Sequence, residues 1–238
     1  MTGSKKYPLL EIASRQFPQY TREQLISFIY CREIAADGEH PADPRHLVDE
    51  HAEITFAVKQ YVSRGGDKLA HALKTWHIDV RGLACIDAGA STGGFTDCLL
   101  QHGAARVYAV DVGYNQLAWK LRNDPRVEVC ERTNIMEFTG EADAAVADLS
   151  FRSIRRAAFH ILSLTRRRWM IALVKPQFEV RHYEAFDGVL RDEKTINQVL
   201  SEVRSGLTKE GVHVDKLIPS PILGRKGNRE YLALLSVA

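Results

Sequence analysis

The chain has 238 residues, of which 45% are hydrophobic and 26% charged, so it can bury one large core, or a large and a small one. Its apolar runs fall well short of the roughly 20 residues of a membrane-spanning helix, and its N-terminus lacks the apolar region of a signal peptide. The four cysteines show neither paired spacing nor a C-x-x-C motif, which is typical of reduced thiols. We expect a cytoplasmic protein without a structural metal.

Charge is distributed unevenly along the chain. Residues 1–59 carry 7 Lys and Arg against 9 Asp and Glu, whereas the remainder carries 25 against 21. The basic excess of the larger part is compatible with a nucleic-acid partner. Phosphate binding, however, needs a local basic patch rather than a favourable total.

Hydrophobic periodicity divides the chain near residue 60. The first part, residues 1–59, predicts two short amphipathic helices over 9–17 and 21–31 and a strand over 52–58. Thr21, followed by Gln24, is the expected N-cap of the second helix. These elements predict a small α+β domain, joined to the rest by a linker over 60–66.

The second part, residues 67–238, alternates helix and strand, which is typical of an α/β domain whose mostly parallel sheet is covered on both faces. A C-terminal strand pair is expected to form an antiparallel hairpin. Helices are predicted over 67–76, 93–103, 115–124, 153–165 and 193–211, and seven strands over 84–89, 106–113, 127–133, 144–151, 170–178, 212–222 and 229–237. The apolar stripe of the 193–211 helix predicts core packing, with Asp192 as its cap.

The loop after the first predicted strand of this domain, DAGASTGG, consists almost entirely of small residues. In such sheets, ligands bind beyond the carboxyl end of this strand, and small residues let a ligand lie on the backbone. Neither G-x-G-x-x-G nor a Walker sequence is present, so a pyrophosphate ligand is disfavoured. Asp111 ends the next strand, where a carboxylate binds ribose hydroxyls.

These features favour a nucleoside without phosphates, of which S-adenosylmethionine (SAM) is the commonest. The alternative is a tight strand–helix turn followed by a surface Asp. The predicted cofactor-binding residues are Asp87, Gly89, Ala90, Ser91, Thr92, Gly93, Gly94, Phe95, Asp111 and Asp148, with Asn134 as a candidate for the adenine edge.

Four ionisable residues stand at strand or helix ends that are expected to meet at one rim: Lys68, Asp148, Lys175 and Glu230. Lys175 directly follows an apolar strand, and partial desolvation there is expected to lower its pKa toward that of a usable base. Together these groups can deprotonate a weakly acidic alcohol and hold it in line with a methyl sulfonium. Three of them also have a simpler interpretation: Asp148 as a helix N-cap, Lys68 as a solvated residue of a first turn, and Glu230 as a partner across the hairpin, whereas Lys175 is the least easily explained in this way.

The runs YVSRGGDKL, DAGASTGGFTD, ADLSF, LVKPQFE, GVLRDE and GNREYLALL closely resemble, in order, those of the TlyA family. Its members are known both as hemolysins and as ribosomal RNA 2′-O-methyltransferases within the FtsJ-like superfamily. The resemblance implies a Rossmann-like class I SAM-dependent methyltransferase that modifies the ribose 2′-hydroxyl of cytidines in 16S or 23S ribosomal RNA of ribosomal subunits. It also implies a Lys-Asp-Lys-Glu tetrad at the four positions above. Lys175 would be the general base, Asp148 and Lys68 would position the ribose, and Glu230 would hold the cluster together.

The resemblance further identifies residues 7–56 as an S4-type RNA-binding domain. The stretch CREIAADGE departs from the family pattern by shifting the arginine to Arg32 and placing Glu33 at its usual position. The linker KQYV also differs from the family's Arg-x-Trp-Val. A small packing domain with little RNA affinity is the alternative. The candidate RNA contacts are Lys5, Lys6, Arg15, Arg22, Arg32 and Arg64.

Other functions are also open. The first is a hemolysin-like membrane-active or RNA-binding protein with a vestigial methyltransferase fold. The second is a methyltransferase for a small molecule or a base nitrogen, although the Asn-Pro-Pro-Tyr run of many base methyltransferases is absent. The remaining arginines, Arg152, Arg155, Arg156 and Arg166 to Arg168, are interpreted as solvated surface in preference to RNA contacts.

Overall fold

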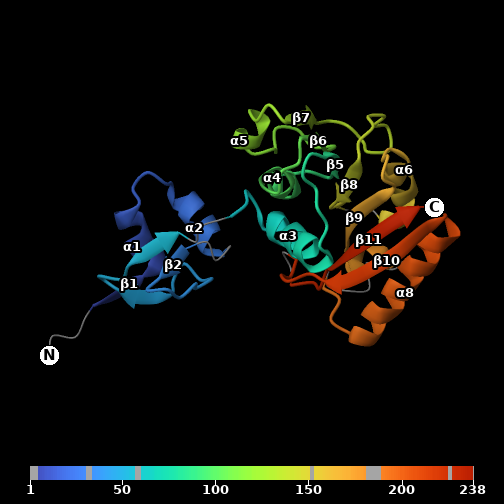
Figure 1. Cartoon of the computed structure of the whole chain (residues 1–238). Coiled ribbons are helices and arrows are strands. Elements are labelled where there is room, and N and C mark those ends of the chain that lie inside the picture. The colour runs from blue at the N-terminus through green and yellow to red at the C-terminus, as the bar shows by residue number, and fades with distance from the viewer. Residues whose placement is uncertain are drawn as a thin grey trace. The chain divides into compact units, whose positions relative to one another are not determined.

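The computed structural model describes residues 5–30, 34–56, 60–150, 153–180, 189–224 and 227–237. The chain forms two compact units, Met1–Lys59 and Gln60–Ala238, which are drawn in Figure 1. Among the described residues, no helix combines the length and apolarity that crossing a membrane requires.

The N-terminal unit is a small α+β fold. Helices α1 (Leu9–Gln16) and α2 (Arg22–Tyr30) accompany two short antiparallel pairs, β1 (Lys6–Pro8) with β3 (Leu47–Asp49) and β2 (Ile34–Ala36) with β4 (Ile54–Phe56). Both predicted helices are confirmed, as is the strand near residue 54. The other three strands, which like β4 have three residues each, went unpredicted.

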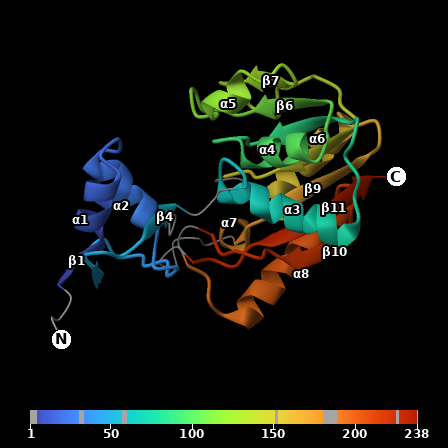
Figure 2. The ribbon, with the colours of Figure 1, turned by 60° about the vertical axis from the view of Figure 1, so that its left-hand side comes forward.

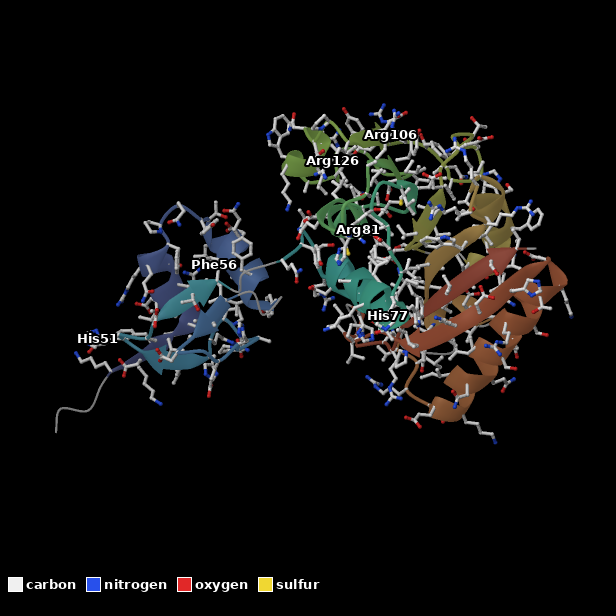
Figure 3. The ribbon with its side chains drawn as sticks, viewed as in Figure 1. His51, Phe56, His77, Arg81, Arg106 and Arg126 are labelled. Carbon is white, nitrogen blue, oxygen red and sulfur yellow. The ribbon has the colours of Figure 1, made fainter. Side chains whose placement is uncertain are left out.

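Two local features stabilise this unit. Thr21 and Gln24 form a reciprocal capping box, in which the Gln24 amide donates to Thr21 Oγ1 and the Thr21 amide donates to Gln24 Oε1, as the sequence predicts. The ring of Phe56 (Figure 3) packs edge-on against those of Phe17 and Phe28, with centroids 4.9 and 5.4 Å away. The unit therefore has its own apolar core.

The larger unit contains a seven-stranded sheet in the order β10-β11-β9-β8-β5-β6-β7. Strands β5 (Ala84–Ala88), β6 (Arg106–Val110), β7 (Val127–Cys130), β8 (Ala144–Ala147) and β9 (Trp169–Val174) are parallel. The last strand, β11 (Tyr231–Val237), runs antiparallel to both β9 and β10 (Val212–Pro219). The predicted sheet and its C-terminal hairpin are confirmed.

Helices cover both faces of this sheet, and two apolar cores result (Figure 2). Helices α3 (Arg64–Trp76) and α4 (Gly94–Gln101) pack on one face, and α6 (Ala158–Ser163) and α8 (Glu193–Lys209) pack on the other. Alternate residues of the strands enter opposite cores. In α8 the buried positions are Ile196, Val199, Val203 and Leu207, and Asp192 Oδ2 accepts from the Thr195 amide as the expected cap.

Several predicted boundaries need correction. Residues 60–66 are not a free linker, because Tyr61 is buried, the Val62 amide donates to Asp97 Oδ2, and α3 already begins at Arg64. The helix predicted over 115–124 is only α5 (Trp119–Arg122). The 153–165 helix is divided into a short 3-10 turn (Ile154–Arg156) and α6. The strand predicted over 170–178 ends at Val174, because Pro176 starts the short helix α7 (Pro176–Glu179).

The N-termini of α3 and α4 meet through glycines. A Cβ on Gly94 would lie 2.1 Å from Ser63 Oγ and 2.9 Å from the Gly66 nitrogen, and a Cβ on Gly66 would lie 2.2 Å from the Tyr61 ring. The two glycine pairs of the SRGG and STGG runs therefore let one helix start directly against the other.

We expect Gly94→Ala to destabilise the protein by roughly 1–3 kcal/mol, because the added methyl overlaps backbone as well as side-chain atoms. Gly65→Ala is the matched control, since its nearest neighbour would be 3.4 Å away and its helical position favours alanine. Urea unfolding of both variants measures the difference. Equal stability of the two variants would contradict this role of the glycine contact.

Candidate active site

Two carboxylates hold the glycine loop between β5 and α4 and the start of α4 in place. Asp111, directly after β6, accepts from the Ser91 amide at Oδ2 (2.8 Å) and from the Gly113 amide at Oδ1 (2.7 Å). Asp87, inside β5, is completely buried and accepts from Thr96 Oγ1 at 2.6 Å. Both carboxylates thus fix the loop from the strand side.

Some of the small residues serve the interior of the protein. A Cβ on Gly89 would lie 2.6 Å from the Asp148 carbonyl oxygen, and one on Gly93 would lie 2.3 Å from Leu121. Both glycines also have positive φ angles, 86° and 97°, which disfavour residues with side chains. The expectation that small residues make room for a ligand is therefore only part of the reason for them.

Register brings three of the four tetrad candidates to one rim of the sheet. Asp148 follows β8, Lys175 follows the neighbouring β9, and Glu230 precedes β11, whose Tyr231 pairs with Val174. Helix α3 adds Lys68. The sheet order thus explains why Asp148, Lys175 and Glu230 meet although they lie far apart in the sequence.

These four residues form two ion pairs. Lys68 Nζ lies 2.5 Å from Glu230 Oε2, and both side chains are more than 90% buried. Lys175 Nζ lies 2.5 Å from Asp148 Oδ1 and also donates to the Leu149 carbonyl at 3.3 Å. The simpler interpretations of Lys68 as solvated, of Asp148 as a helix cap and of Glu230 as a hairpin partner are wrong: Ser153 caps the 3-10 turn, and Glu230 pairs with α3.

A cleft of about 460 Å³ opens at this rim. Its lining comes from the start of α3, the glycine loop, the segments after β8 and β9, and the segment before β11. All four tetrad candidates line it, together with Gly89, Ala90, Ser91, Thr92, Gly94 and Phe95 of the predicted cofactor set and Arg64 of the predicted RNA set. The structure therefore places the glycine loop and both ion pairs around one cavity.

Other predicted site residues lie outside this lining. Asp87 and Gly93 are buried beneath the loop, Asp111 supports the loop, and Asn134 accepts from the Met136 amide at 3.2 Å. In the N-terminal unit, Lys5, Lys6 and Arg22 are exposed, whereas Arg15 pairs with Glu11 and stacks over Tyr7. Arg32 and Arg152 fall outside the described residues.

Sequence reasoning missed two features near the cleft. Gln177 and Phe178, on α7, line it, although the run was interpreted as strand. Arg155 is no solvated arginine, because its Nε donates to the buried Glu179 carboxylate at 3.2 Å. Pro176 was the available signal for the first feature, since proline favours the first turn of a helix; no local pattern marks the second.

Comparison with known proteins agrees with this geometry. A family model of FtsJ-like methyltransferases matches residues 61–236. The chain is 40% identical over 225 residues to the 16S/23S rRNA (cytidine-2′-O)-methyltransferase TlyA of Mycobacterium tuberculosis, covering 90% of this chain and 84% of that protein. The chain belongs to the TlyA family of FtsJ-like methyltransferases. Hemolysin A of Brachyspira hyodysenteriae is 43% identical over 196 residues, covering 77% of this chain and 80% of that protein.

A solved structure extends the likeness beyond the methyltransferase unit. A candidate hemolysin from Streptococcus thermophilus superposes with a TM-score of 0.76 at 36% identity, and the match covers 99% of this chain and 90% of that one. The seven-stranded fold and the N-terminal α+β unit of this TlyA-family chain are therefore both typical of its relatives.

Removal of one member of the buried Lys68–Glu230 pair is expected to destabilise the protein by about 3–5 kcal/mol, because the other charge is left buried without its partner. The double variant Lys68→Met/Glu230→Leu is expected to lose about 1–3 kcal/mol less than the sum of the single losses. Chemical unfolding of the four proteins gives this coupling. Arg229→Ala breaks a neighbouring exposed ion pair with Glu193 and serves as a control, for which we expect no measurable loss of stability. If the stability losses of the two single variants simply add up in the double variant, the two residues are not coupled.

Asp87 gives the stability of the protein a distinctive pH dependence. Burial raises its pKa to about 7, partly opposed by the Thr96 hydrogen bond, and Oδ1 has no hydrogen-bond partner among the described residues. Since the folded protein holds this proton more tightly than the unfolded chain, the carboxyl group destabilises the fold increasingly as pH rises from about 4 to 7. The free energy of unfolding of Asp87→Asn, relative to that of wild type, should thus rise by about 1–3 kcal/mol between pH 5 and pH 8 in urea unfolding. A difference that stays constant or shrinks would refute it.

Proposed function

We propose that this chain is a SAM-dependent methyltransferase that methylates the ribose 2′-hydroxyl of cytidines in ribosomal RNA. The observation that carries the proposal is the shared cleft, in which the Lys175–Asp148 and Lys68–Glu230 pairs face the glycine loop. The activity named for the Mycobacterium tuberculosis relative supports the same reaction and substrate. Ribosomal subunits would be the partner, and the cytoplasm the place of action.

The residues around the cleft fit SAM. The cleft volume of about 460 Å³ lies within the range of small-molecule sites, and residues 89–92 line it with backbone and small side chains. Asp111 holds Ser91 in this lining. When bound, SAM supplies a methyl group on a positively charged sulfur.

Lys175 is suited to accept the proton of the substrate hydroxyl. Lys175 Nζ donates to the Leu149 carbonyl at 3.3 Å and lies 2.5 Å from Asp148 Oδ1, with which it forms an ion pair. Lys175 also lines the cleft, where a substrate oxygen can approach its nitrogen. As the neutral amine, Lys175 can take the proton from the 2′-hydroxyl, and Asp148 stabilises the ammonium that results.

The second pair also lines the cleft. Glu230 neutralises Lys68 within a buried environment, so this pair adds no net charge to the cleft. Lys68 projects from α3 beside Arg64, which is exposed at the mouth of the cleft. Lys68 would therefore position the ribose, and Arg64 would contact the RNA backbone, since arginine pairs readily with phosphate.

The N-terminal unit is proposed as an S4-type RNA-binding domain over residues 1–59. Three exposed cations, Lys5, Lys6 and Arg22, support this role, whereas Arg15 is engaged by Glu11 and the unit carries an acidic balance. The contribution of this unit to the affinity for RNA is therefore expected to be modest.

Lys175→Ala is expected to lower methyl transfer at least about 100-fold, because the proton acceptor is lost. The measurement is tritium transfer from labelled SAM to intact ribosomal subunits and to free ribosomal RNA, followed by nuclease digestion to 2′-O-methylcytidine. Lys216→Ala changes an exposed lysine of β10 and serves as the matched control. Thermal stabilisation by S-adenosylhomocysteine should persist in both variants. Label on a base, or undiminished label in Lys175→Ala, would reject the proposal.

A further inference from the structure

Gln177 is a buried polar side chain without an assigned task. It lies on α7, two residues after Lys175, is 7% exposed and lines the cleft. Within the part of the chain that the structure describes, its Oε1 has no hydrogen-bond partner. An unpaired buried acceptor costs about 1–3 kcal/mol, so its retention beside the reactive lysine suggests that a ligand supplies the partner.

An aromatic ring adjoins this amide. Phe178 also lines the cleft, and its ring centroid lies 5.7 Å from Lys175 Nζ. A flat apolar ring beside a hydrogen-bonding amide is the combination with which proteins recognise an unstacked nucleobase, because the ring meets the face of the base and the amide meets its edge.

The cofactor is a less suitable partner for Gln177 than the target nucleotide. The glycine loop follows β5, whereas α7 follows β9, and β8 lies between these two strands in the sheet. Gln177 thus lies beyond Lys175 on the acceptor side. The base and the 2′-oxygen are attached to neighbouring ribose carbons, so a 2′-hydroxyl at Lys175 brings its own base into this part of the cleft.

We infer that Gln177 binds the base of the target nucleotide, with its side-chain carbonyl accepting a hydrogen bond from the exocyclic amino group of cytosine and the Phe178 ring against the base. This inference rests on the function proposed above. Uracil carries a carbonyl oxygen where cytosine carries that amino group, and Gln177 could bond to it only by turning its amide to present the NH₂ group. The contact therefore contributes to the choice of cytidine as long as the amide keeps its carbonyl toward the base.

Glu179 fixes the helix that presents Gln177. Its buried carboxylate accepts from Ser153 Oγ at 2.5 Å and from the Ile154 amide at 2.8 Å, and its backbone carbonyl accepts from Arg155 at 3.1 Å. Gln177 is therefore held on a short helix anchored at its far end.

The test compares Gln177→Leu, which removes donor and acceptor, with Gln177→Glu, which keeps only acceptors. Gln198→Leu, an exposed position on α8, is the matched control. The measurement is kcat/KM for tritium transfer from SAM to ribosomal subunits, with stabilisation by S-adenosylhomocysteine recorded for each variant. We expect Gln177→Leu to lose about 10- to 100-fold and Gln177→Glu to stay within about 10-fold of wild type. Unchanged transfer in Gln177→Leu, or equal losses in both, would overturn the inference.

A second set of subunits, carrying uridine in place of the methylated cytidine, tests base choice. A carboxylate has no donor for the uracil oxygen, so Gln177→Glu should transfer no methyl group to these subunits. Gln177→Leu should have the same kcat/KM for cytidine and for uridine. A cytidine preference retained by Gln177→Leu would overturn the inference even if its rate falls. Failure of wild type to form any 2′-O-methylcytidine would instead reject the proposed function, so the two failures are distinguishable.

Discussion

A buried ion pair between Lys68 and Glu230 constrains the candidate active site. Two charges removed from water are tolerated only when each meets its partner in close geometry, and here the partners lie on α3 and just before β11, 162 residues apart. The pair ties the first helix of the methyltransferase unit to the antiparallel strand beside β9. Because Tyr231 pairs with Val174, the same contact places α3 beside the strand end that carries Lys175.

The second constraint is the close approach of backbones around the glycine loop. Because Gly94 and Gly89 have no side chains, the start of α3 packs directly against Gly94 and the carbonyl of Asp148 packs directly against Gly89. The same loop lines the cleft where a cofactor is expected. Small residues are therefore needed here for two reasons: the loop packs closely against neighbouring protein atoms, and it also lines a cleft that must stay open for a ligand.

The sequence predicts the fold and much of the cleft because both depend on local signals. Apolar strands that end in Asp148 or Lys175 are visible in the sequence, and a parallel sheet brings such ends to one rim. Pairing is different. That Glu230 meets Lys68 rather than a hairpin neighbour depends on sheet order, and that Arg155 meets Glu179 depends on how two loops pack. All four strands of the N-terminal unit have three residues; β4 was predicted because it lies within the longer apolar run 52–58, and the other three were missed.

Glu179 shows how a residue outside the cleft affects the chemistry within it. Its carboxylate accepts three hydrogen bonds from residues 153–155, which tie the segment after β8 to the segment after β9. The first segment supplies the Leu149 carbonyl and the second supplies Lys175, whose Nζ donates to that carbonyl. Asp148, the ion-pair partner of Lys175, lies in the same segment as Leu149, so if the two segments moved apart, Lys175 would lose both contacts and its nitrogen would no longer be held in one orientation. Hydrogen bonds outside the cleft lining therefore help to orient the nitrogen that we propose as the proton acceptor.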